Sequence, residues 1–184
     1  MERSTLALAL NNQAGSDELS FLALNFQLTE TSTLPEKLLL IPAETFSGLD
    51  GRAWNNPTPE SVVATTRHIG RDIPIDIEHA TELKGPKGEP APTQAWIRRD
   101  NLEVIDGAIW GRVEWNDNGR QLVEGKAYRY YSLAFYWDQH GNVRSIKSVG
   151  LTSTQKPAGI PGAQSSVTST SRKIKVTRLI PNFL

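Results

Sequence analysis

Two residues of this chain could together carry out nucleophilic catalysis, His79 and Ser132. A serine hydroxyl is a poor nucleophile until a neighbouring base accepts its proton, and imidazole titrates in the range that this task needs. The chain holds three histidines and no cysteine, so the choice of base is small and a thiol nucleophile is excluded. Such a pair would attack a carbonyl carbon, with the histidine first accepting the proton and then giving it to the leaving group.

Ser132 lies in a segment with strong strand character. Residues 128–137 are rich in aromatic side chains, which favours a β-strand. Alternation along the strand puts Ser132 on the less apolar face, beside the small Ala134, and so leaves a path for a carbonyl. From the pattern alone, a serine that is merely tolerated in a half-buried strand is the commoner interpretation.

His79 closes a second expected strand, residues 73–79. In a regular strand the acids of this run, Asp76 and Glu78, point away from the face that carries His79. We therefore expect neither acid to orient the imidazole, and the opposite faces argue against a metal site made by the three residues. The alternative interpretation is a structural histidine at a strand end, beside a solvated acidic edge. The other histidines, His68 and His140, are expected at the surface.

Composition is that of a soluble globular protein. The 184 residues are 38% hydrophobic and 22% charged, and Lys+Arg and Asp+Glu are both 20, so the formal net charge is zero. Nucleic-acid and membrane surfaces usually require a basic excess, so we expect neither partner. The apolar run at residues 6–10 is too short for a secretory signal, and no run is long enough to span a bilayer. We expect a cytoplasmic protein.

The pattern predicts an α+β, mainly β fold: a small closed or nearly closed β-barrel with one or two short helices. Further strands are expected at residues 21–26, 37–42, 94–98, 102–105, 108–115 and 143–152, helices at 59–69 and 117–126, and loops at 45–56 and 81–92. Residues 1–158 are expected to form one domain. Residues 159–171, rich in Gly, Ser, Thr and Pro, are expected to be a flexible linker, and 172–184 a C-terminal tail or docking segment.

Several short blocks also follow the order of a known family. They are residues 40–52, 74–79, 111–115, 128–132 and 150–152, the last followed by Pro157 and Ala158. This ordered set resembles the Mu-like prophage I protein, the head-maturation protease of Mu-type phages, over roughly residues 38–158. That family in turn resembles the phage prohead proteases and the herpesvirus assemblins, which are serine proteases on a small β-barrel.

The resemblance implies roles for individual residues. Ser132 matches the nucleophile and His79 the general base, and no metal or cofactor is implied. Related proteases hold the base with a histidine or a carboxylate, but the matching stretch, residues 148–152, offers neither. Two hydroxyls share one face of this stretch, Thr152 as the first candidate for the third member and Ser148 as the second. A hydroxyl would stabilise an imidazolium less than a carboxylate does.

The function that the resemblance implies is prohead maturation inside the immature capsid, in the bacterial cytoplasm. The substrates would be the scaffold, the protease itself and other head proteins; the partners would be the scaffold and major capsid proteins, with a second copy of the chain as a further candidate. Small residues at 163–165 make the linker a candidate self-cleavage region. The alternative is a non-catalytic capsid-assembly or scaffold-binding module that keeps the protease fold, which the missing third acid favours.

Overall fold

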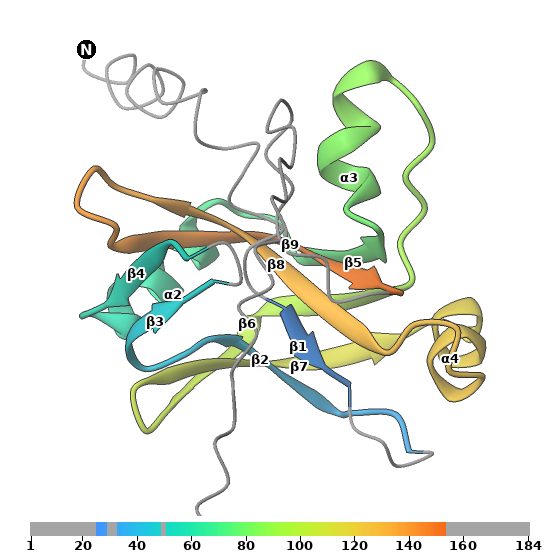
Figure 1. Cartoon of the computed structure of the whole chain (residues 1–184), viewed down its shortest axis with the longest axis horizontal. Helices are drawn as coiled ribbons and strands as arrows, with labels where there is room; N and C mark the ends of the chain where they lie inside the picture. The colour runs from blue at the N-terminus through green and yellow to red at the C-terminus, as the bar shows by residue number, and fades with distance from the viewer. Residues whose placement is uncertain (1–24, 29–32, 49–50, 154–184) are drawn as a thin grey trace, which may run out of the picture.

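The computed structural model describes residues 25–28, 33–48 and 51–153 (Figure 1). The expected linker at 159–171, with its candidate self-cleavage region, and the segment 172–184 lie outside the described residues, as does most of the strand expected at 21–26.

A seven-stranded sheet forms most of the described chain and curls strongly into a half-barrel (Figure 1). Its strand order is β1-β8-β9-β5-β6-β7-β2. The strands are β1 (Asn25–Gln27), β2 (Lys37–Ile41), β5 (Ile73–Ile77), β6 (Ala95–Ile105), β7 (Ala108–Trp115), β8 (Tyr130–Trp137) and β9 (Val143–Thr152). Neighbouring strands are antiparallel except β5 and β9, which run parallel. The prediction of a mainly β fold with short helices is confirmed, and the expected closed or nearly closed barrel is a strongly curled half-barrel.

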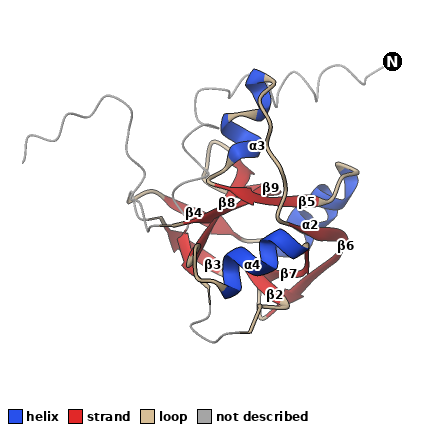
Figure 2. Cartoon of the chain, turned by 90° about the vertical axis from the view of Figure 1, so that its right-hand side faces the viewer, coloured by secondary structure: helices blue, strands red, loops and turns tan. Residues whose placement is uncertain are grey.

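In the described part of the chain, three short helices pack around the sheet (Figure 2). They are α2 (Pro59–His68), α3 (Ala80–Leu83) and α4 (Asp117–Glu124), and a 3₁₀ turn, Gly85–Lys87, follows α3. The helices expected at 59–69 and 117–126 are both present, whereas α3 lies where a loop was expected. Among the described residues, no helix is long and apolar enough to cross a bilayer.

A two-stranded hairpin replaces the other expected loop, at residues 45–56. Its strands are β3 (Glu44–Ser47) and β4 (Ala53–Asn56). Phe46 pairs with Trp54 across the hairpin, with ring centroids 6.1 Å apart, and both rings pack against Phe135 in the core. The glycines of this segment belong only to the turn, so the aromatic cross-strand pair decides the structure.

A single strand, β6, also replaces the two strands expected at 94–98 and 102–105. Its register against β7 shifts between Ile97 and Leu102, and this irregularity breaks the alternation of the sequence. The β6–β7 hairpin turns as expected at Asp106 and Gly107, which both have positive φ, 49° and 77°.

Alternation along the central strands separates the core from the outer face. Ile75, Val149 and Leu133 are paired across β5, β9 and β8, and all three are fully buried in the hydrophobic core. The residues that follow or precede them by one therefore point to the opposite, outer face of the sheet. That outer face is the one on which the candidate catalytic residues lie.

Candidate active site

Three residues form a row across the outer face of the sheet. Ser132 on β8 is in register with Gly150 on β9, and Gly150 is in register with Asp76 on β5. Figure 1 shows β9 between the other two strands. Ser132 and Asp76 therefore flank Gly150, one on each side.

The sequence pattern had suggested that His79 is the last residue of a strand. In the structure His79 lies outside the strand. β5 ends at Ile77, and Glu78 and His79 both have positive φ, 52° and 58°. The carbonyl oxygen of His79 then accepts the N–H groups of Glu82 and Leu83, at 3.0 and 2.9 Å, as α3 begins. Two successive left-handed residues are costly for side chains with a Cβ and persist only when surrounding contacts hold them. The turn redirects His79 relative to a regular strand.

Gly150 shows where the imidazole lies. A Cβ on Gly150 would be 2.8 Å from both Cγ and Cδ2 of His79 and 2.9 Å from its backbone nitrogen. The ring therefore lies directly over the Gly150 backbone, where no other residue would leave room. The sequence carried one signal for this, because a glycine inside a strand often marks a close approach of other atoms.

The ring of His79 reaches the serine. His79 Nε2 and Ser132 Oγ are hydrogen-bonded, and both side chains are fully buried. The predicted contact between these two residues is confirmed. Burial lowers the pKa of His79 to about 3, so the imidazole is neutral near pH 7. Neutral imidazole is the form that can accept the serine proton, and acceptance at Nε2 requires the ring proton to be on Nδ1.

The two hydroxyls proposed as the third member differ in their surroundings. Ser148 Oγ donates to Glu82 Oε1 at 2.8 Å, so the structure places this hydroxyl against α3. Glu82 also forms an ion pair with Lys147, at 2.7 Å. Thr152 is buried and in register with Tyr130, and its role as third member stays a prediction.

Asp76 lies on the same face of the sheet as the His79 ring, whereas the sequence pattern predicted the opposite face. It is in register with Gly150, the residue under the His79 ring, so the expectation that Asp76 lies on the opposite face from the histidine is wrong, although the structure contains no hydrogen bond between Asp76 Oδ1 and His79 Nδ1. The reason is that His79 lies beyond the end of the regular strand. Asp76 Oδ2 accepts the backbone N–H of Thr81 at 2.7 Å. Burial raises the pKa of Asp76, although the hydrogen bonds from Thr81 act in the opposite direction.

Comparison with known proteins shows the family to which the chain belongs. The family model described as "Mu-like prophage I protein, N-terminal domain" matches residues 38–161. The chain belongs to this family. It is 22% identical over 163 residues to the Mu-like prophage FluMu I protein of Haemophilus influenzae, in an alignment that covers 81% of this chain and 44% of that protein. The chain thus spans less than half the length of that relative. No solved structure matches it.

The remaining residues singled out from the sequence lie elsewhere in this Mu-like domain. His68 ends α2 and His140 lies in the turn between β8 and β9, and both are exposed. Glu78 Oε1 accepts from the backbone nitrogen and the hydroxyl of Ser153, both at 3.1 Å. Within the described residues, no group of three metal-binding side chains comes together.

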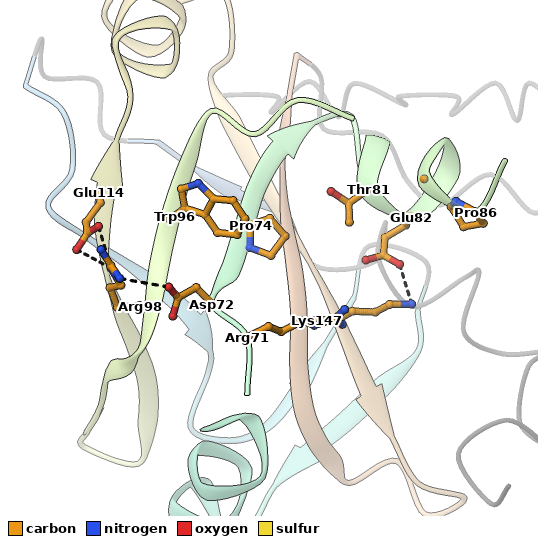
Figure 3. A pocket seen from close by; sticks show the side chains of 11 residues that line it. Arg71, Asp72, Pro74, Thr81, Glu82, Pro86, Trp96, Arg98, Glu114 and Lys147 are labelled. Carbon is orange, nitrogen blue, oxygen red and sulfur yellow. Dashed lines mark hydrogen bonds and ion pairs between the residues drawn. The ribbon is translucent and has the colours of Figure 1, made fainter. Parts of the chain in front are cut away.

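A hollow of about 790 Å³ lies on the same outer face, between α3 and the strands β5, β6 and β7 (Figure 3). Trp96 and Pro74 form its apolar floor. Two ion pairs lie in its walls: Arg98 with Glu114 at 3.1 Å, and Lys147 with Glu82 on the side of α3. Neither Ser132 nor His79 lines it, so we assign it no part in the chemistry.

Proposed function

We propose that this domain is a serine endopeptidase that matures a phage prohead by cleaving the scaffold, itself and other head proteins. The observation that carries the proposal is the hydrogen bond between His79 Nε2 and Ser132 Oγ, made by an imidazole that burial keeps neutral. Membership of the Mu-like prophage I family supports the phage context.

The chemistry follows from this pair. Ser132 Oγ attacks the scissile carbonyl carbon while His79 Nε2 accepts the hydroxyl proton. The imidazolium then donates this proton to the leaving amine, and the acyl group remains on the serine. In the second half-reaction a water molecule attacks the ester carbon while His79 accepts one of its protons. The imidazolium then returns this proton to Ser132 Oγ as the acyl–oxygen bond breaks and the carboxylic acid product leaves. No metal or cofactor enters these steps.

The substrates and place of action in this proposal come from the family context. A prohead protease meets its scaffold and the major capsid protein inside the immature capsid, in the host cytoplasm, and a second copy of the chain is a further candidate partner. Incubating the protein with each candidate substrate, followed by mass spectrometry of the products, tests the proposal. Cleavage of the scaffold or capsid protein is expected from the wild-type chain and absent from Ser132→Ala.

One observation favours the second candidate, a non-catalytic capsid-assembly or scaffold-binding module. Ser132 and His79 have no exposed surface, 0% for each side chain. A peptide carbonyl can reach Ser132 only after atoms that cover it move. A module that keeps the fold without catalysis would need no such movement.

A fluorophosphonate probe separates the two candidates, because it labels only an activated serine. We expect labelling of the wild-type protein and none of Ser132→Ala. The matched control is Ser145→Ala, which removes another buried strand serine, 4% exposed, from β9. It should be labelled like the wild type. An unlabelled wild-type protein, or a labelled Ser132→Ala, would contradict the protease assignment.

A further inference from the structure

A buried general base must accept a charge during the reaction. His79 is fully buried and its pKa is lowered by that burial. When it takes the proton of Ser132 it becomes an imidazolium in surroundings that disfavour charge. Serine proteases solve this problem with a group that holds the ring and stabilises its positive form. The chain should therefore provide such a group next to the ring.

The strand register identifies the side chain best placed for this. Gly150 lies under the ring, and its neighbours in register are Ser132 on β8 and Asp76 on β5. Side chains of residues in register point to the same face of a sheet. A ring that lies over Gly150 and reaches Ser132 on one side therefore has Asp76 on the other.

The two oxygens of Asp76 are used unequally. Oδ2 accepts the backbone N–H of Thr81 at 2.7 Å, which ties the carboxylate to the turn that carries His79. Oδ1 is buried and accepts no hydrogen bond from the described residues. Asp76 as a whole is 0% exposed. Buried carboxylate oxygens almost always have partners, so a free acceptor at this depth points to a role beyond the turn.

We propose that Asp76 is the positioning residue for His79: in solution Oδ1 accepts a hydrogen bond from the Nδ1–H of the ring, a bond that the structure does not itself contain, while Oδ2 anchors the turn at Thr81. This inference rests on the proposed protease function. It places a carboxylate where the sequence offered only the hydroxyls of Ser148 and Thr152. Ser148 already donates to Glu82, and a threonine hydroxyl carries no charge to balance an imidazolium.

Two other charged groups near this site, Glu82 and Lys147, pair with each other. Glu82 of α3 faces Asp76, and its charge adds to the effect of burial in raising the pKa of that carboxyl. Lys147 of β9 neutralises Glu82 in an ion pair of 2.7 Å. An imidazolium at His79 would act on Asp76 in the opposite direction and favour the carboxylate.

The test compares Asp76→Asn with Glu78→Gln by the rate of fluorophosphonate labelling across pH. Asparagine keeps an oxygen for the Thr81 N–H but loses the charge. We expect labelling to fall by at least about 100-fold, since changing the orienting acid to its amide in a serine protease lowers kcat by about 10⁴-fold. Without the carboxylate the pKa of His79 falls, so the acid limb of the pH profile should move to lower pH. Glu78→Gln removes an equal charge from the same turn and should keep both rate and profile.

If Asp76 only stabilised the turn through Thr81, we would expect a different result. If Asp76→Asn is labelled at the wild-type rate with an unmoved acid limb, the inference is overturned and the protease assignment stands. If the wild-type protein itself is not labelled, both are overturned.

A second measurement uses the wild-type protein alone, so it does not depend on whether a variant folds. In the ¹⁵N-labelled wild-type protein, the Nδ1 proton of His79 should resonate far downfield, as for an N–H bonded to a carboxylate. A resonance typical of an N–H bonded to a neutral oxygen would overturn the inference.

Discussion

The proposed nucleophile and its proposed base lie in two regions of opposite character. Ser132 lies in the β8–β9 hairpin, where regular pairing runs from Tyr130↔Thr152 through Ser132↔Gly150. His79 lies beyond the end of β5, in a turn in which two consecutive residues are left-handed. The direction of Ser132 follows from local alternation, whereas the direction of His79 depends on contacts with distant residues.

This difference shows where the site is vulnerable. A side chain in a paired strand is held by backbone hydrogen bonds on both sides, so single substitutions nearby leave its direction unchanged. The turn that carries His79 is stabilised by the hydrogen bond from the Thr81 N–H to Asp76 Oδ2. It also requires glycine at position 150, because a side chain there would clash with His79. Residues of β5 and β9, rather than neighbours of the serine, should therefore dominate the mutational response.

Gly150→Ala should have the largest effect, and it tests whether the position of the turn is the weak point. The new Cβ would lie 2.8 Å from His79 Cγ and 2.9 Å from its backbone nitrogen, too close for either to stay in place. We expect loss of fluorophosphonate labelling by 100-fold or more, on the order of a misplaced catalytic group. The free energy of unfolding should fall by about 1–3 kcal/mol, as for overpacking.

The control is Gly85→Ala. A Cβ at Gly85 meets no atom within 4 Å, and its φ is not in the left-handed region. This variant should match the wild type in stability and labelling. If Gly150→Ala is labelled at the wild-type rate, the ring does not depend on lying over this residue.

The regular half of the molecule could be predicted from the sequence. The bounds of β9 were predicted at both ends, and α2 and the turn between β6 and β7 lie where the expected ranges placed them. The failures have a common cause, which is contact with distant residues. The hairpin that contains Phe46 was predicted to be a loop because of its glycines. Its packing depends on Phe135, which is distant in the sequence.

Glycines carried information that local propensity could not reveal. Gly119 lies inside α4, where glycine lowers helix propensity, but a Cβ at this position would lie 2.1 Å from the carbonyl oxygen of Gln94. The glycine is what lets the helix approach β6. Gly150 allows the approach of His79 in the same way, and the position of Asp76 became clear only once the strand was seen to end at Ile77. Such approaches are set by three-dimensional packing.

The second prediction concerns the pH dependence of stability. Because burial lowers the pKa of His79 to about 3, the unfolded chain binds a proton below its ordinary pKa of about 6.5 and the folded chain does not. The contribution of His79 to the free energy of unfolding is fully present above about pH 6.5 and is lost progressively as the pH falls towards 3. Between pH 7 and pH 5 the loss should approach about 2 kcal/mol.

Denaturant unfolding of wild type and His79→Gln at pH 7 and pH 5 isolates this contribution, since other groups titrate alike in both. Measuring the same pair in an Asp76→Asn background sharpens the comparison. Because the pKa of His79 is already about 3, removing the carboxylate should leave the loss between pH 7 and pH 5 unchanged, and a larger loss without it should appear only in measurements extended towards pH 3. Equal slopes for wild type and His79→Gln in both backgrounds would show that the fold tolerates the imidazolium.

The smallest effect is expected from Ser148→Ala, which tests the regular side of the comparison. Ser148 lies two residues from Gly150 on the same face, yet its hydroxyl donates to Glu82. Losing this hydrogen bond should lower the free energy of unfolding by about 1 kcal/mol, because Lys147 still pairs with Glu82. Fluorophosphonate labelling should change by no more than a few-fold. A loss as large as that of Gly150→Ala would instead assign Ser148 to the imidazole, and the ring would then be held from β9 rather than from β5.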